Sequence, residues 1–66
     1  MQIFVNGEAR EVPESTSMAA LVERMELTGR RIAVEVNEEL VSRSEFEQFS
    51  LSDGDKIEII HAVGGG

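Results

Sequence analysis

Residues 1–12 read MQIFVNGEAREV, and this stretch decides how the fold begins. Two short β-prone runs, residues 3–5 and 8–12, flank an Asn-Gly pair at positions 6 and 7. Asn-Gly between two such runs is the strongest short-range signal for a β-hairpin, because both turn residues must accept a positive φ. The opening of the chain is therefore predicted to be an antiparallel hairpin.

Side chains alternate between the two faces of a strand. That alternation places Ile3 and Val5 on one face of the hairpin and Phe4 on the other. Pro13 has no N–H to give to a ladder, so it is expected to end the second strand.

One amphipathic helix is predicted after the hairpin. Ser17 is the expected N-cap, because a serine oxygen can accept a bond from the first free N–H groups of a helix. Apolar residues then follow at i, i+3, i+4 and i+7, a spacing that forms one stripe on a helix: Met18, Leu21, Val22 and Met25. Gly29 is the predicted helix stop.

The middle of the chain predicts a third strand, in which Ile32, Val34 and Val36 share one buried face. Asn37-Glu38 turns the chain, and Leu40-Val41 is expected to form a very short strand. Ser44 is the expected cap of a single helical turn.

That helical turn is expected to carry Phe46 and Phe49 into the core. A turn at Asp53-Gly54-Asp55 then leads into a last strand over residues 56–63. Its predicted inward residues are Ile57 and Ile59, and its outward residues are Glu58 and Ile60.

The element order is therefore β-β-α-β-(β)-β, and each element has one apolar face. Such elements bury those faces only by packing in two layers. The sequence predicts an α+β fold in which a mixed sheet of four to five strands packs across one helix. Residues 1–63 form this domain, and residues 64–66 form a flexible glycine tail.

Composition narrows the class of function. The chain has 66 residues, no cysteine, 13 acidic and 6 basic residues, and a formal net charge of -7. Nucleic-acid binding normally needs a basic footprint, so an acidic chain disfavours it. Without cysteine there is neither a disulfide nor a thiolate metal site. No apolar run is long enough to span a membrane, and we expect a cytoplasmic protein.

No constellation of side chains indicates an independent enzyme. The single histidine, His61, has no nucleophile or carboxylate partner at a fixed spacing and is interpreted as a plain strand-end residue. The carboxylates of Glu35, Glu38 and Glu39 are interpreted as a solvated edge, because hard-cation sites take several oxygens from one tight loop.

Several stretches together resemble the ubiquitin-like β-grasp proteins, and among these the ThiS family of sulfur carriers. The similarity covers the full length, and it is most evident in residues 33–37, in residues 41–46, and from the Asp53-Gly54-Asp55 turn to Gly66. Two features depart from the family pattern. Phe46 stands where many relatives have a tryptophan, and the tail has three glycines where two would suffice.

The resemblance implies a function for the tail. A ThiF-type adenylyltransferase, similar to the ubiquitin-activating enzymes, would adenylate the carboxylate of Gly66 with Mg-ATP. A sulfur donor fed by a cysteine desulfurase would then form a thiocarboxylate, which supplies sulfur to a ThiG-type thiazole synthase for the thiazole ring of thiamin. Gly64 and Gly65 would provide reach. The carrier itself would bind no cofactor or metal and would catalyse nothing. Arg43 matches an arginine of the family and either contacts a partner or caps a loop.

Docking on these partners requires a surface. The strand phases place Phe4, Ile60 and Ala62 on the outer face of the sheet, which predicts an apolar docking patch. Single exposed apolar residues are also normal on proteins, which is the plainer interpretation.

Three alternatives remain open from the sequence. The chain can be a sulfur carrier similar to the small subunit of molybdopterin synthase, a ubiquitin-like modifier joined to lysines, or a passive β-grasp binding module.

Overall fold

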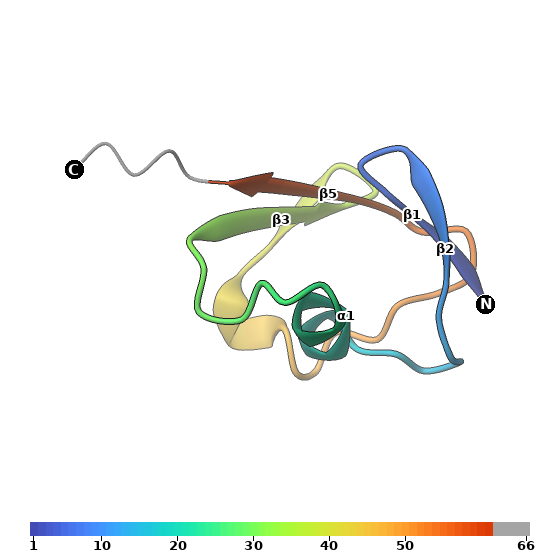
Figure 1. Cartoon of the computed structure of the whole chain (residues 1–66), viewed down its shortest axis with the longest axis horizontal. Helices are drawn as coiled ribbons and strands as arrows, with labels where there is room; N and C mark the ends of the chain where they lie inside the picture. Colours follow the sequence, from blue (N-terminus) through green and yellow to red (C-terminus); the bar gives the residue numbers. More distant parts are fainter. Residues whose placement is uncertain (62–66) are drawn as a thin grey trace.

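The computed structural model describes residues 1–61. In chain order the elements are β1 (Gln2–Val5), β2 (Glu8–Glu11), α1 (Met18–Arg24), β3 (Ile32–Val36), β4 (Glu39–Val41), the 3-10 turn η1 (Arg43–Glu45) and β5 (Lys56–His61). The five strands form one sheet in the order β2-β1-β5-β3-β4, and α1 lies across one face of it (Figure 1). The predicted α+β, β-grasp arrangement is confirmed. Ala62 and the predicted boundary between residues 63 and 64 lie outside the described residues.

The first hairpin forms as predicted. Asn6 and Gly7 both adopt positive φ, at 50° and 85°, which is the backbone that a two-residue turn of this kind requires. Ile3 and Val5 are buried, and Phe4 lies on the opposite face at intermediate burial. β1 then pairs in parallel with β5, whereas the other neighbouring strands pair antiparallel.

Helix α1 begins as predicted. The hydroxyl oxygen of Ser17 accepts a hydrogen bond from the Ala20 N–H at 3.1 Å, and the stripe of Met18, Leu21 and Val22 is buried. Met25 is only partly buried. Within residues 1–61, no helix has the length and apolar character needed to cross a membrane.

The predicted helix stop at Gly29 is wrong. α1 ends at Arg24, and Glu26 is the residue that adopts the left-handed conformation after it, with φ 60°. The Glu26 N–H donates to the Glu23 carbonyl, and the Leu27 N–H donates to the Val22 carbonyl, both at 2.9 Å. This pair of bonds is a Schellman motif, and it satisfies the last carbonyls of the helix without glycine.

The second hairpin also follows the sequence pattern, because Asn37 and Glu38 both have positive φ and join β3 to β4. The cap of η1, however, is Ser42 and not Ser44. The Glu45 carboxylate accepts from the Ser42 N–H at 3.4 Å and from the Ser42 hydroxyl at 2.9 Å. Phe46 is buried and Phe49 partly buried, as expected.

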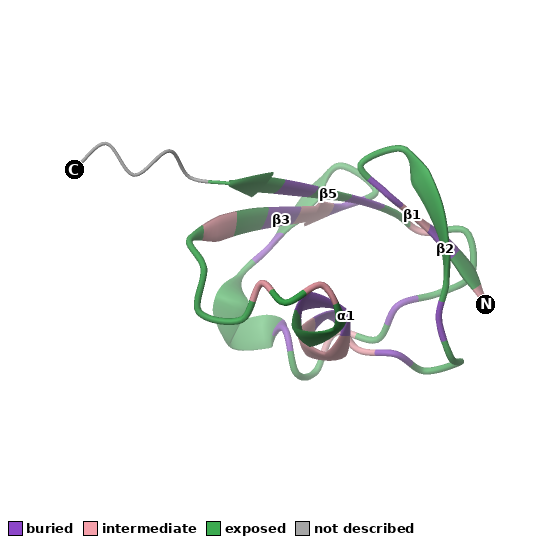
Figure 2. Cartoon of the chain, in the orientation of Figure 1, coloured by how far each residue is buried: buried purple, intermediate pink, exposed green. Residues whose placement is uncertain are grey.

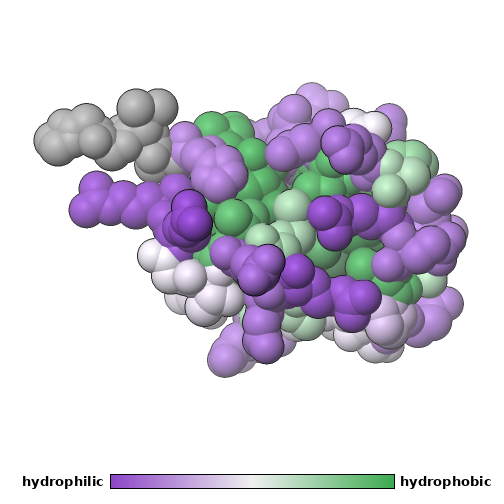
Figure 3. All heavy atoms as spheres, viewed as in Figure 1, coloured by the Kyte–Doolittle hydropathy of each residue, from purple (hydrophilic) through white to green (hydrophobic). Residues whose placement is uncertain are grey.

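The core lies between the sheet and α1, where buried residues from both layers face each other (Figure 2). On the face viewed in Figure 3, hydrophobic residues gather in the middle and hydrophilic residues surround them. The core consists of Ile3, Val5, Val12, Met18, Leu21, Val22, Val34, Val36, Val41, Phe46, Leu51, Ile57 and Ile59. In the described part of the chain, no buried side-chain nitrogen or oxygen lacks a hydrogen-bond partner.

Candidate functional site

The candidate site is the end of strand β5 and the chain that follows it. β5 is the central strand of the sheet, with β1 on one side and β3 on the other. β3 pairs with β5 from Ile57, opposite Val36, to His61, opposite Ile32. Gly64, Gly65 and Gly66 lie outside the described residues, and the described part of the site is the strand that precedes them.

The start of β5 is fixed by Asp53 and Gly54. The Asp53 carboxylate accepts from the Gln2 N–H at 2.8 Å, and the Gly54 N–H donates to the Gln2 carbonyl at 2.7 Å. Gly54 has a φ of 86°, which a glycine adopts without a Cβ clash. This turn therefore attaches the start of β1 to the segment that leads into β5.

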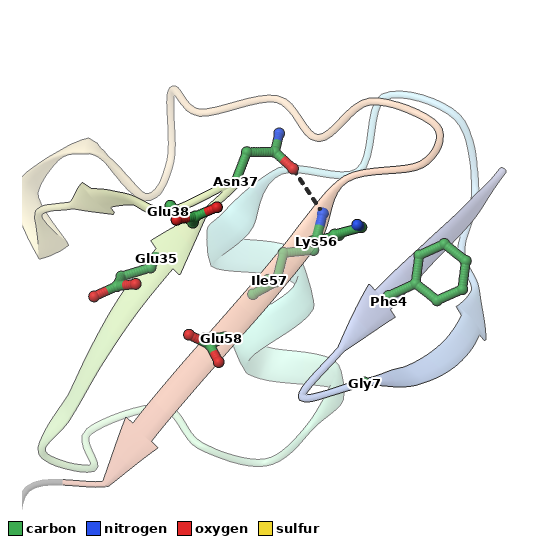
Figure 4. Close-up of a pocket in the computed structure, with 8 residues that line it drawn as sticks. All are labelled: Phe4, Gly7, Glu35, Asn37, Glu38, Lys56, Ile57 and Glu58. Atoms are coloured by element: carbon green, nitrogen blue, oxygen red, sulfur yellow. Dashed lines mark hydrogen bonds between the residues drawn. The ribbon is translucent and has the colours of Figure 1, made fainter.

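A second set of bonds attaches the same end of β5 to the turn after β3. The Asn37 amide nitrogen donates to the Asp55 carboxylate at 3.0 Å, and the Lys56 N–H donates to the Asn37 amide oxygen at 3.0 Å (Figure 4). The other oxygen of Asp55 accepts from the Ser52 N–H at 2.8 Å. The Asp-Gly-Asp turn thus fixes the alignment of β5 with β1 on one side and with β3 on the other. The sequence indicated the turn but not these bonds.

The predicted docking residues share one face but do not lie together. Phe4 stands opposite Lys56, at the start of β5, whereas Ile60 stands opposite Ala33, near its end. Glu58 lies between them on the same face of β5. Ile60 is 51% exposed and is the described apolar residue of β5 nearest to the glycines. Ala62 lies outside the described residues, and the docking role remains a prediction.

Leu40 is an exposed apolar residue that the sequence reasoning missed. It is 71% exposed and lies opposite Glu35 on the outer face of the sheet. A signal was present, because Leu40 and Val41 are adjacent on one strand and must point to opposite faces. Val41 is buried, so Leu40 faces outward.

Acidic side chains occupy the outer face between these apolar residues. An open hollow there is lined by residues of β1, β3 and β5 and of the turns beside them, including Glu35, Glu38 and Glu58 with one ammonium, that of Lys56 (Figure 4). In residues 1–61, no group of three His, Cys, Asp or Glu side chains is arranged to hold a metal ion. This face suits a partner surface with basic groups.

Arg43 makes a side-chain hydrogen bond to another part of the chain, whereas His61 is described by its exposure and its backbone pairing. The Arg43 guanidinium donates to the carbonyl of Arg30 at 2.6 Å, which joins η1 to the loop after α1. This contact favours the loop-capping alternative over a partner contact. His61 is exposed, and its backbone pairs with Ile32 at the end of the β3–β5 ladder.

Comparison with known proteins gives consistent matches. The model of the ThiS family matches residues 3–66. The sulfur carrier protein ThiS of Escherichia coli is 27% identical over 66 residues, which are the whole of both chains. The crystal structure of a thiamine biosynthesis protein, ThiS, from Geobacter metallireducens superposes with a TM-score of 0.86 at 30% identity and covers both chains completely.

A longer relative contains a segment that is similar to this chain. A thiazole synthase of Paramagnetospirillum magneticum is 39% identical over 66 residues, which are all of this chain but 20% of that protein. The chain therefore spans about a fifth of the length of the thiazole synthases that it matches.

Proposed function

Because this chain belongs to the ThiS family, we propose that it is a sulfur carrier of thiamine biosynthesis whose working group is the Gly66 carboxylate. The observation that carries the proposal is the family match over residues 3–66, which includes the last strand and all three terminal glycines. The E. coli relative bears the name of such a carrier.

The chemistry requires activation, because a free carboxylate has no good leaving group. An oxygen of the Gly66 carboxylate attacks the α-phosphorus of ATP, and pyrophosphate leaves. Hydrosulfide then attacks the acyl carbon of the adenylate, and AMP leaves; with a persulfide donor the acyl disulfide formed first is cleaved by a thiol, which is oxidised to a disulfide. The product is a thiocarboxylate at Gly66. The activating enzyme supplies ATP, Mg²⁺ and every catalytic group, so the carrier contributes only a reachable carboxylate.

The sequence of the tail suits this role. Glycine has no Cβ and lets another backbone approach closely, which a narrow channel in a partner demands. Three glycines extend over about 10 Å. Because β5 is held on both sides at its start, these glycines follow a strand whose position in the sheet is defined.

We propose three partners for the cycle: a ThiF-type adenylyltransferase, a sulfur donor fed by a cysteine desulfurase, and a ThiG-type thiazole synthase. The third has direct support, since a relative named thiazole synthase contains a segment 39% identical to this chain. That relationship favours the thiazole of thiamin over molybdopterin as the destination of the sulfur.

The proposal is tested by the intact mass of the chain after incubation with a ThiF-type enzyme, Mg-ATP and sulfide. We expect one oxygen to be replaced by sulfur, with the change mapped to Gly66 by fragmentation. Omission of ATP is the control and should leave the mass unchanged.

An unchanged mass would contradict the proposal, provided that the same enzyme converts another carrier. Covalent adducts to lysines in cell extract would then support the modifier, and their absence would support the passive binding module.

The exposed end of β5 is proposed to dock on the activating enzyme. Ile60→Asp is expected to raise the KM of adenylation about tenfold with little change in kcat. Full burial of an isoleucine contributes about 1.5–3 kcal/mol, and a tenfold change in affinity corresponds to about 1.4 kcal/mol. The measurement is pyrophosphate release at varied carrier concentration.

Leu40→Asp is the matched control, because Leu40 is also apolar and exposed on the outer face. It lies two strands away from Ile60, with β3 between β5 and β4, and it is two residues further from the end of the β3–β5 ladder. Its KM should stay within about twofold of the original value, since only a loss well below 1 kcal/mol is expected there. Equal effects of the two variants would argue against a docking site centred on Ile60.

A further inference from the structure

Asn6 makes two hydrogen bonds to β5, and the second of them lies beyond the last residue pair of the β1–β5 ladder. Its backbone N–H donates to the Ile57 carbonyl at 2.9 Å. Its side-chain Oδ1 accepts from the Ile59 N–H, also at 2.9 Å. Asn6 itself stands in the turn of the first hairpin, where φ is 50°.

These contacts matter because β1 is shorter than β5. The paired residues on the β1 side are Phe4 with Lys56 and Val5 with Ile57, after which the chain turns away into β2. On the other side, β3 accompanies β5 to His61. The Asn6 carboxamide therefore takes the place of the next backbone acceptor that a longer β1 would have provided.

The hydrogen bond to Ile59 is partly buried, and the Ile59 side chain is 5% exposed. A partly buried N–H that loses its acceptor destabilises the local pairing, because water replaces the bond only after the strand opens. Among the described residues, Ile59 lies two positions before the end of β5. Loss of this bond would thus loosen the stretch that precedes the glycines.

We propose that Asn6 is a positioning residue for the reactive C-terminus: its carboxamide holds the end of β5 in the sheet and so sets the place from which the Gly66 carboxylate is presented. This inference rests on the proposed function. When the end of β5 frays, only those molecules in which the strand is still paired can dock on a partner. The apparent affinity of the carrier is the intrinsic affinity multiplied by the fraction of paired molecules.

Two variants separate the carboxamide from the turn. Asn6→Gly keeps a residue that accepts positive φ but removes the acceptor. Asn6→Asp keeps an acceptor oxygen, and Asp-Gly is also favoured in this turn. Both variants should therefore form the hairpin, and only Asn6→Gly should release the Ile59 N–H.

The test combines amide hydrogen exchange with adenylation kinetics. In Asn6→Gly we expect exchange at the Ile59 amide to rise at least tenfold, while exchange at the Val34 amide, inside the sheet, stays the same. The KM for the carrier should rise about twofold with kcat unchanged, because a tenfold rise of the opening constant, from about 0.1 to about 1, leaves about half of the molecules competent to dock. Asn6→Asp should restore both values.

Unchanged exchange at Ile59 in Asn6→Gly would overturn the inference, and so would faster exchange with an unchanged KM. Equal loss in Asn6→Asp and Asn6→Gly would also overturn it, because an acceptor oxygen would then be irrelevant. If the original chain is not adenylated by an enzyme that activates another carrier, the proposed function itself fails. That result is distinct, because it appears before any variant is compared.

Discussion

Ile57→Ala is expected to lower the free energy of unfolding by about 3 kcal/mol, the middle of the range for truncation of a buried isoleucine. Ile57 is 1% exposed on the central strand, opposite Val5 of β1 and Val36 of β3. A domain of this length has a total free energy of unfolding of about 3–10 kcal/mol, at roughly 0.05–0.15 kcal/mol per residue. The substitution therefore removes a large share of the stability.

Urea unfolding followed by circular dichroism measures this effect. In a separate thermal unfolding experiment, the melting temperature should fall by about 15 °C, since about 1 kcal/mol shifts it by 4–8 °C in small domains. Ile60→Ala is the matched control, because it removes the same atoms from the same strand at a position that is 51% exposed. Its cost should be below about 0.5 kcal/mol. Similar midpoints for the two variants would contradict the burial assigned to Ile57.

Deletion of Gly66 is expected to lower the rate of thiocarboxylate formation at least a hundredfold. The shortened chain still ends in the two glycines that suffice for a narrow channel, but its carboxylate stands about 3.5 Å closer to β5 in an extended tail, so the expected loss comes from reach and not from the number of glycines. A displacement of about 1 Å at a reacting centre can already cost a hundredfold in rate. The measurement is the fraction of thiocarboxylate formed over time, by intact mass.

The comparison variant is Gly66→Ala, which keeps the length of the tail and adds one methyl group. It should lose less rate than the deletion, because its carboxylate still reaches the same depth. The unfolding midpoint of both variants should match that of the original chain. A deletion variant that is converted at the original rate would show that the length of the tail does not determine activation.

Local chemistry made much of the fold predictable. Positive φ at positions 6 and 37 follows from Asn-Gly and Asn-Glu turns between alternating strands, and the cap at Ser17 follows from its place before an apolar stripe. The stop of α1 was not predictable in this way. Glu26 closes a Schellman motif because Leu27 reaches back to Val22, and tertiary packing of Leu27 outweighs the preference for Gly29.

The candidate site was predictable only in part. Family resemblance predicts Gly66 as the working residue, which stays a prediction, and alternation along the strand placed Phe4 and Ile60 on one face. Phe4 and Ile60 are separated because β1 pairs with only the start of β5. This register joins distant segments of the chain, so no local sequence pattern predicts it. The same is true of the Asn6 contact with Ile59, which joins residues 53 positions apart. The exposed Leu40 was missed because its strand is only three residues long.

The central position of β5 also determines when this protein can fold. β5 is the last strand in residues 1–61, yet β1 and β3 both need it as a neighbour. Contacts between such distant segments form slowly, because a long loop must close before they stabilise anything. During synthesis, at about 5–20 residues per second, every earlier element is made before its central partner exists. A chain that has not yet reached β5 therefore cannot complete the sheet, and the edges of β1 and β3 that face β5 stay unpaired until it is made.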